Sequence, residues 1–355
     1  MLCQLKNLGL GAMATLAWPC LAQATCSRKR EHGTPYSKRD KALVRNRKRL
    51  QVGGEPLSPR SSISDFSSLI PHSKSQISNL KSQIPDCRHT VNPRESFVDI
   101  HCHILPGLDD GASSREEALA MAEMAVADGI TTIIATPHQL GNNAKNAGQM
   151  IRAATDDFQR FLEQRHVSLQ VLPGADVRIE PDLPQRIRGG EVLTLGDRRR
   201  HVLLELPHEV YVPLDRLVDE LKSAGVIGIL SHPERNRGLL NQPGVLRPLV
   251  ERGCLLQVTG GSLTGAFGSQ VQKFASSLVE QGLVHFVASD AHGMKERTPL
   301  LGAAFARVAD LAGENVANEL CCSNPKAVAA GGVVPTGRRK ATKSGWTSWF
   351  CGRSL

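Results

Sequence analysis

Short apolar segments between residues 97 and 292 repeatedly end in a histidine or a carboxylate. The first, residues 97–100, leads into His101 and His103, which share a face because alternate residues of an extended chain point the same way. Further imidazoles and carboxylates lie at or just beyond the ends of later segments, at His138, Asp176, Glu205, His232, Asp290 and His292. The carboxyl ends of parallel strands converge on one face of a (β/α) barrel. The pattern therefore predicts such a barrel, with these side chains gathered at one mouth.

The segments between these strands have the features of helices and loops. Ser114, followed by Glu117, forms a capping box before an amphipathic stretch. A turn after the first strand brings Asp109 and Asp110 back toward the same mouth. We expect strands at 97–100, 130–135, 169–172, 202–205, 226–230, 254–258 and 284–288, and further helices at 143–165, 214–224, 244–252, 269–281 and 300–329.

Composition divides the chain into three parts. Residues 1–95 are rich in Ser, Arg, Lys and Pro and lack apolar periodicity, which indicates a disordered basic extension. Residues 1–24 have the weak outline of a signal peptide; alternatively, the extension is a linker or reflects a mis-assigned translation start. Residues 96–330 hold the alternating strands and helices, and we expect the Gly-, Lys- and Arg-rich residues 331–355 to form a solvated basic tail.

The net charge of +9 is concentrated at the two ends. Residues 1–95 carry 16 basic and 6 acidic side chains, and residues 331–355 carry 5 basic and no acidic ones, so residues 96–330 carry −6. Phosphate contacts need clustered Lys and Arg on the folded surface, so this distribution argues against nucleic-acid binding by the barrel. No apolar segment reaches the length of a transmembrane segment.

The nine cysteines are scattered, odd in number and without a Cys-x-x-Cys pair, which does not suit a disulfide framework. A reducing compartment fits this distribution, and we expect the protein to be cytoplasmic. Cys102 lies between the two histidines but faces the opposite way, so we interpret it as a small buried apolar residue.

The motifs at the strand ends also occur together in a known family. In order they read H-x-H, D-D-G, T-P-H, G-A-D, L-E-L-P, S-H-P-E-R and S-D-A-H, within residues 97–327. They resemble the PHP (polymerase and histidinol phosphatase) superfamily, and within it the bacterial capsular and exopolysaccharide protein-tyrosine phosphatases. The resemblance implies an α/β fold, a distorted TIM-like (β/α)7 PHP barrel, with a trinuclear metal centre that favours manganese.

The resemblance also implies how nine candidate ligands divide among three metal ions. His101, His103, Asp176 and Asp290 would hold the first ion, Asp176 would bridge to a second completed by Glu205 and His232, and Asp110, His138 and His292 would hold the third. Imidazole and carboxylate ligands suit Mn, Fe or Zn rather than a structural zinc held by thiolates. A hydroxide that bridges neighbouring metals could attack phosphorus in line, with no phosphocysteine intermediate.

Two arginines match basic residues of the family, Arg235 in S-H-P-E-R and Arg297 after the S-D-A-H loop. Guanidinium groups hold phosphoryl oxygens bidentately and offset the charge that develops during transfer, so both are candidate catalytic residues. The alternative is that Arg235 pairs with a ligand carboxylate and that Arg297 is an ordinary surface residue.

The sequence departs from the family at Asp176, where family members usually carry Glu. Loss of one methylene withdraws the carboxylate by roughly 1.5 Å, which is large beside metal–ligand distances of about 2.0–2.2 Å. Either the backbone approaches the metals to compensate, or the bridge is weakened and the protein is an inactive or two-metal relative.

The resemblance implies hydrolysis of phosphotyrosine on a protein, in particular the tyrosine kinase that controls capsular or exopolysaccharide synthesis. Two alternatives stay open: a phosphatase for a small metabolite such as histidinol phosphate, and a catalytically inactive metal-binding regulator. The nuclease branch of the superfamily fits less well, because no basic groove accompanies the barrel. The sequence does not indicate an oligomeric state.

Overall fold

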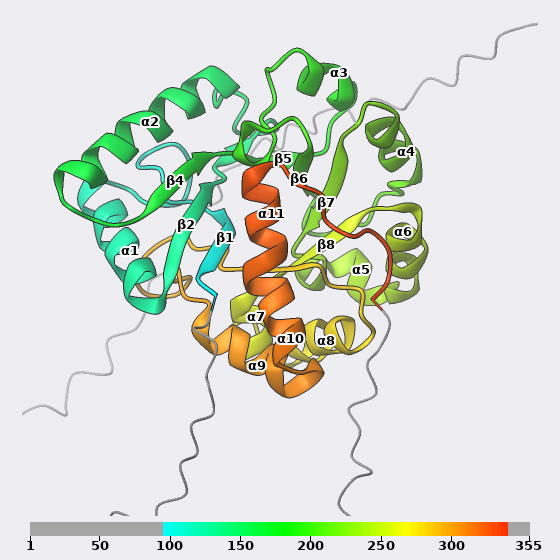
Figure 1. Cartoon of the computed structure of the whole chain (residues 1–355). Helices are drawn as coiled ribbons and strands as arrows, with labels where there is room; N and C mark the ends of the chain where they lie inside the picture. The colour runs from blue at the N-terminus through cyan, green and yellow to red at the C-terminus, as the bar shows by residue number, and fades with distance from the viewer. Residues whose placement is uncertain (1–94, 340–355) are drawn as a thin grey trace, which may run out of the picture. The chain divides into compact units, whose positions relative to one another are not determined.

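The computed structural model describes residues 95–339, which form a parallel barrel (Figure 1). Its strands are β1 (Phe97–Cys102), β2 (Ile130–Ala135), β3 (His138–Gln139), β4 (Gln170–Pro173), β5 (Asp176–Arg178), β6 (His201–Glu205), β7 (Ile227–Ser231), β8 (Leu255–Thr259) and β9 (Phe286–Ala288). Hydrogen bonds join β1, β2 and β4 in one sheet and β3, β5, β6, β7, β8 and β9 in a second, and every pairing is parallel.

Two of the barrel strands are broken, so the nine described strand segments fill seven positions. β2 leads into β3 across Thr136-Pro137, and β4 leads into β5 across Gly174-Ala175. Pro137 has no N–H to donate to a ladder, which favours a break there. A Cβ at Gly174 would lie 2.6 Å from Ile134 Cγ2, so the close approach of these strands requires glycine. The seven positions confirm the predicted fold class, an α/β distorted TIM-like (β/α)7 barrel.

The segment after β9 closes the ring beside the end of β1. The backbone N–H of His103 donates to the carbonyl of Ala291 (2.8 Å), and the N–H of Asp290 donates to the carbonyl of His101 (2.7 Å). These bonds join segments that are nearly 190 residues apart in the sequence. They place Asp290 and His292 next to the two histidines of the H-x-H motif.

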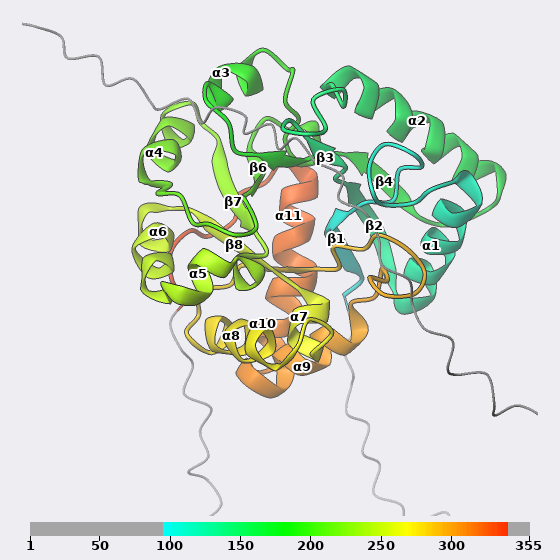
Figure 2. The same cartoon turned by 180° about the vertical axis from the view of Figure 1, so that it is seen from behind.

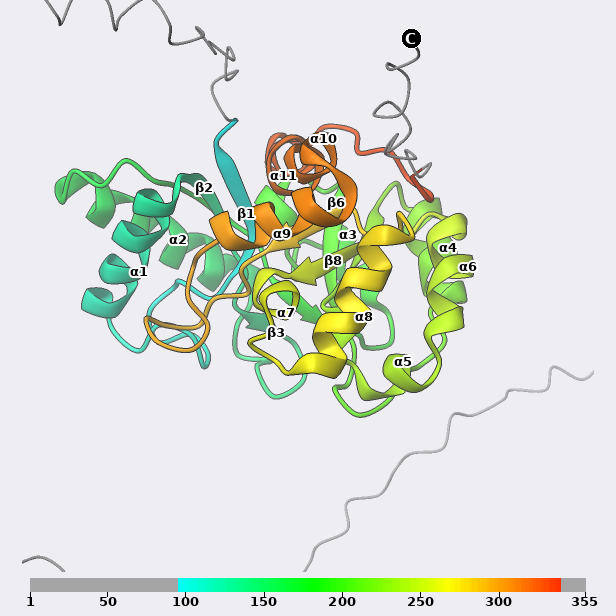
Figure 3. The ribbon, with the colours of Figure 1, turned by 90° about the horizontal axis from the view of Figure 1, so that it is seen from below.

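Helices cover the outside of the barrel, as Figures 2 and 3 show from two further sides. α1 (Arg115–Asp128) and α2 (Gly148–Gln164) lie on the side of β1, β2 and β4, whereas α4 (Asp215–Ser223) and α6 (Leu246–Arg252) lie beside β7. The remaining helices are α3 (Leu183–Arg188), α5 (Arg237–Asn241), α7 (Gly260–Thr264), α8 (Ser269–Glu280), α9 (Gly302–Ala312), α10 (Glu314–Asn318) and α11 (Asn324–Ala330). Within residues 95–339, no helix is both long and apolar enough to cross a membrane.

Local hydrogen bonds set where the helices begin. The hydroxyl of Ser114 accepts from the backbone N–H of Glu117 (3.2 Å), which confirms the predicted start of α1. The helix expected from residue 143 begins only at Gly148, because the Asn146 amide donates to the carbonyls of Leu108 (3.1 Å) and His138 (2.9 Å) and holds its own segment as a loop. The helix expected over 300–329 is divided into α9, α10, a π-helical turn and α11.

α11 closes the amino end of the barrel. Val328 and Ala329 of this helix pack in one buried cluster with inward-facing strand residues, among them Ile100, Leu203 and Phe286. The amino end of the barrel is therefore apolar and filled, which leaves the carboxyl end for polar side chains.

Residues 331–339, which we expected to belong to the solvated tail, contact the barrel. Val334 is buried in the same interior cluster, the Gly337 carbonyl accepts from Nε2 of His285 (3.0 Å), and the Arg339 N–H donates to the Gly282 carbonyl (3.0 Å). Composition averaged over the whole tail hid an apolar side chain that enters the core. The predicted extension before residue 95 and the tail from residue 340 lie outside the described residues.

Replacing Val334 with Ala should lower the free energy of unfolding by about 1–3 kcal/mol, because it removes buried methyl groups and leaves a cavity. The neighbouring Val333 is 70% exposed and provides a matched control, for which we expect a change within about 0.5 kcal/mol. Urea unfolding of the full chain measures both variants. Equal midpoints for the two variants would show that this segment does not stabilise the barrel.

Candidate metal centre

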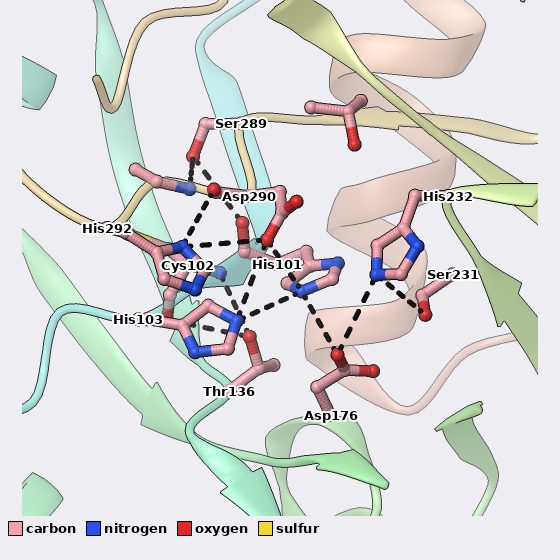
Figure 4. Close-up of polar contacts among 12 residues, drawn as sticks. His101, Cys102, His103, Thr136, Asp176, Ser231, His232, Ser289, Asp290 and His292 are labelled. Atoms are coloured by element: carbon pink, nitrogen blue, oxygen red, sulfur yellow. Dashed lines mark hydrogen bonds and ion pairs between the residues drawn. The ribbon is translucent and has the colours of Figure 1, made fainter. Parts of the chain in front are cut away.

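The nine side chains predicted as ligands lie together at the carboxyl end of the barrel, and Figure 4 shows six of them. Their donor atoms form four overlapping groups, and within each group all donors lie within 4.8 Å of one another. The groups are His103, Asp110, His138 and His292; His101, His103 and Asp290; His101, Asp176 and His232; and His138, Asp176 and Glu205. Because the groups share members, the side chains form one continuous cluster rather than separate sites.

The broken strands deliver two members of this cluster. His138 lies opposite Asp176 in the register of β3 and β5, directly after the two breaks. The backbone N–H of Asp176 donates to the carbonyl of Pro137 (3.2 Å), which holds the two segments together. The breaks in β2 and β4 thus turn both side chains toward the mouth.

Several buried polar atoms of the cluster have no hydrogen-bond partner within the described residues. They are Nδ1 of His138, both carboxylate oxygens of Asp176, Oδ1 of Asp290 and Nε2 of His292. Leaving a buried polar group unsatisfied is costly, and most buried polar atoms in proteins have partners. All of these atoms are potential metal ligands, so bound cations would satisfy them.

Asp176 belongs to two of the four donor groups, and Figure 4 shows it below His101 and His232, with dashed lines to both. It is fully buried, and its Oδ2 lies 3.6 Å from Nε2 of His101, 3.5 Å from Nδ1 of His138 and 3.9 Å from Nε2 of His232. Burial opposes ionisation, but the imidazoles of His101, His232 and His138 hold the pKa of Asp176 below its usual value. The shorter side chain therefore still reaches three imidazoles.

A hydrogen bond at Nδ1 fixes the imidazole ring of each of the residues His101 and His103. Nδ1 of His101 donates to Oε1 of Gln257 in β8 (2.8 Å), and Nδ1 of His103 donates to Oδ2 of Asp109 (2.7 Å). With the proton on Nδ1, each neutral ring presents a lone pair at Nε2, and the two Nε2 atoms lie only 3.2 Å apart. Burial lowers the pKa of His103 to about 3, so this ring is neutral at physiological pH. Two lone pairs held this close indicate a place for a cation.

Asp109 and Gln257, which the sequence analysis did not assign, are hydrogen-bond partners of candidate ligands. Asp109 also accepts hydrogen bonds from the backbone N–H groups of His138 (2.9 Å) and Gly111 (3.0 Å). A Cβ at Gly111 would overlap the His103 carbonyl, so the loop requires glycine there. The available signals were the first aspartate of D-D-G and a polar residue, Gln257, in the otherwise apolar segment 254–258.

The two carboxylate oxygens of Asp290 contact different groups. Its Oδ1 lies 3.2 Å from Nε2 of His101 and 3.6 Å from Nε2 of His103, whereas its Oδ2 pairs with the guanidinium groups of Arg235 and Arg297. Burial would raise the pKa of Asp290, but His101 and Arg235 hold it well below its usual value. Asp290 therefore links the imidazole cluster to the two arginines.

Both predicted arginines lie at the mouth of the barrel. Arg235 comes from a 3-10 turn (Pro233–Arg235) after β7, and its side chain is almost fully buried. Arg297 lies in the loop after β9, donates from Nε to the Asp290 carbonyl (3.1 Å) and pairs with Oδ2 of Asp290 at 2.5 Å. Arg235 thus contacts a candidate ligand carboxylate, and Arg297 belongs to the site rather than to a remote surface.

The remaining donors lie closer to solvent. Glu205 is partly buried, and burial together with the charge of Asp176 raises its pKa to about 7. Asp110 is 67% exposed and lies 3.4 Å from Nε2 of His292 and 3.5 Å from Nε2 of His138. Burial and the neighbouring Arg235 lower the pKa of His232 to about 4. The lowered pKa values of His103 and His232 keep these two imidazoles neutral, which is the form that binds metals.

Comparisons with known proteins agree with this geometry. Residues 97–330 match the model of the family described as capsular polysaccharide synthesis, CpsB/CapC. The chain is 43% identical over 203 residues to the tyrosine-protein phosphatase YwqE of Bacillus subtilis (strain 168), covering 57% of this chain and 79% of that protein. It is 28% identical over 243 residues to the tyrosine-protein phosphatase CpsB of Streptococcus pneumoniae, covering 65% and 98%.

A solved structure extends the comparison to the whole barrel. It comes from the metal-dependent tyrosine phosphatases YwqE of Bacillus subtilis and CpsB of Streptococcus pneumoniae, and it aligns with a TM-score of 0.65 and 37% identity. The alignment covers 68% of this chain and 99% of that one. Because the family model covers nearly all of the described residues, the chain belongs to the CpsB/CapC family, as the order of its motifs predicted.

Proposed function

We propose that this chain is a metal-dependent phosphatase that hydrolyses phosphotyrosine on a protein. The observation that carries the proposal is the set of buried donor atoms without hydrogen-bond partners, which surrounds Asp176 and the paired Nε2 atoms of His101 and His103. Such a set suits divalent cations and no apolar ligand. Relatives named as tyrosine-protein phosphatases support the choice of substrate.

Three metal ions would divide the nine donors. As the family resemblance implies, His101, His103, Asp176 and Asp290 would hold the first, Asp176 with Glu205 and His232 the second, and Asp110, His138 and His292 the third; all nine side chains belong to the continuous donor cluster. Asp176 belongs to two of the overlapping donor groups, so it would be a ligand that two ions can share. Mixed nitrogen and oxygen donors fit manganese, and they also accept iron or zinc.

The chain's own residues bind and orient the phosphoryl group. When bound, divalent ions supply Lewis-acid stabilisation of the phosphoryl oxygens and generate the nucleophile from water. Arg235 and Arg297 act as the catalytic arginines, because their guanidinium groups converge at Asp290 and can donate to phosphoryl oxygens placed beside it. Burial raises the pKa of the Cys102 thiol well above its usual value, so this cysteine does not provide a thiolate.

The substrate protein is, in this proposal, the tyrosine kinase that controls capsular or exopolysaccharide synthesis, and the reaction takes place in the cytoplasm. The description of the family supports the connection to capsular polysaccharide. A second candidate, a catalytically inactive metal-binding regulator, is favoured only by Asp176, which stands where the family usually has Glu.

The full chain, stripped with a chelator and reloaded with Mn²⁺, should hydrolyse a phosphotyrosyl peptide with kcat/KM at least about tenfold above that for histidinol phosphate. The apoprotein should lose this activity, because the proposed nucleophile is generated from water by the bound ions. Phosphate release measures both reactions, and elemental analysis of protein purified without added metal identifies the native ion. Preferential hydrolysis of histidinol phosphate would contradict the proposed substrate class.

Replacing Asp109 with Asn should weaken Mn²⁺ binding by about 10–100-fold, because the imidazole of His103 loses the carboxylate that holds its Nδ1 proton. Titration calorimetry on the apoprotein measures the affinity directly. Asp156, an exposed residue of α2, offers the same Asp-to-Asn change away from the site as a control. Unchanged affinity in the Asp109 variant would mean that the Asp109 carboxylate does not support metal binding through His103.

Replacing Asp176 with Glu distinguishes the proposal of an active phosphatase from that of an inactive regulator. Asp176 already contacts three imidazoles in a fully buried site, so an added methylene should overpack it, destabilise the fold by about 1–3 kcal/mol and lower kcat. Activity on the phosphotyrosyl peptide and thermal unfolding measure the two effects. A gain in activity would instead favour the regulator, with Asp176 as the reason for its weak catalysis.

A further inference from the structure

A groove adjoins the metal centre on the side of Arg235. It has a volume of about 460 Å³, and its walls include His208, Arg235, Arg237, Leu240, Phe267 and Val271. α5 supplies Arg237 and Leu240, and the loop before α8 supplies Phe267; Figures 2 and 3 show these two helices side by side. A second hollow, between α3 and α4, contains none of the nine donors and neither arginine of the centre. The groove beside Arg235 is therefore the candidate site for substrate contacts next to the metal centre.

Arg235 belongs to both the centre and the groove. One of its terminal nitrogens pairs with Asp290, while its guanidinium carbon lies 4.8 Å from the centroid of the Phe267 ring. Its Nε is buried and has no hydrogen-bond partner within the described residues. A phosphoryl group bound by Arg235 would thus lie beside the Phe267 ring. The alcohol part of the phosphate ester would then extend from the metal centre into the groove.

The loop around Phe267 presents this ring toward the groove. Gly265 and Gly268 bracket it with φ values of 95° and 89°, a backbone region that favours glycine. A Cβ at Gly261 would lie 3.1 Å from the ring, so the backbone of α7 approaches it closely. Phe267 remains partly exposed despite this contact. A partly exposed aromatic ring on a loop shaped by glycines suits a binding role better than a core role.

We propose that Phe267, with the apolar wall of Leu240 and Val271, forms the subsite for the phenyl ring of phosphotyrosine and so selects aryl over alkyl phosphates. This inference rests on the proposed phosphotyrosine hydrolysis. Aromatic rings gain from offset or edge-to-face packing with each other beyond the area they bury. The short side chains of phosphoserine and phosphothreonine carry no ring to make this contact, so they gain nothing from Phe267.

Binding of phosphonates to the full-length, Mn²⁺-loaded protein tests the proposal without turnover. Replacing Phe267 with Leu keeps an apolar side chain but removes the ring, so we expect phenylphosphonate to bind about five- to tenfold more weakly and methylphosphonate to change less than about twofold. Replacing Phe267 with Trp should retain phenylphosphonate binding. Titration calorimetry measures these affinities.

Phe161 on α2 provides a matched control, because Arg165 lies over its ring at 4.9 Å in a similar arrangement away from the groove. Replacing Phe161 with Leu should leave both affinities unchanged. Equal weakening of phenylphosphonate and methylphosphonate in the Phe267 variant would mean that the ring only supports Arg235, and no weakening would mean that the groove is not used; either result overturns the proposal. A wild-type protein that fails to hydrolyse phosphotyrosine but binds phenylphosphonate through Phe267 would overturn only the proposed reaction.

Discussion

The metal centre depends on hydrogen bonds at Nδ1 that fix the imidazole rings of His101 and His103. His101 and His103 can direct their Nε2 lone pairs at each other across 3.2 Å only because Gln257 and Asp109 hold the protons on the opposite ring nitrogens. Asp109 does more than this, because it also binds the backbone N–H of His138 and so joins the loop after β1 to β3. The repulsion between inward-facing donors is a cost to the fold that bound cations would remove.

Packing elsewhere in the barrel supports this arrangement. The amino end is filled by α11 and Val334, and beneath the centre the buried Asp99 accepts from the N–H (3.0 Å) and hydroxyl (2.5 Å) of Ser289. This contact ties β1 to the end of β9 directly below the donors. Asp290 and His232 have positive φ values, 52° and 33°, which non-glycine residues adopt only where surrounding contacts impose them. Within residues 95–339, two of the seven non-glycine residues with positive φ thus lie at the site.

The fold class and the convergence of the strand ends could be predicted from the sequence. Strand periodicity and barrel topology together determine where residues at the carboxyl ends of the strands lie. It did not reveal Asp109 or Gln257 as partners of the histidines, because hydrogen bonds across 156 residues, as between His101 and Gln257, depend on strand order. Nor could it place Arg297 against Asp290, since that contact depends on the path of a loop. Val334 was missed because composition describes a segment and not the single side chain that enters the core.

Asp290 connects the two halves of the site in electrostatic terms. Its Oδ1 faces the imidazoles and its Oδ2 holds Arg235 and Arg297, so one carboxylate balances positive charge on both sides. Cations beside Oδ1 would draw its charge toward the imidazoles and weaken its hold on the arginines. The guanidinium groups would then have more capacity to donate to a phosphoryl group. Occupation of the metal centre and binding of the phosphorylated substrate would then be coupled through the buried side chain of Asp290.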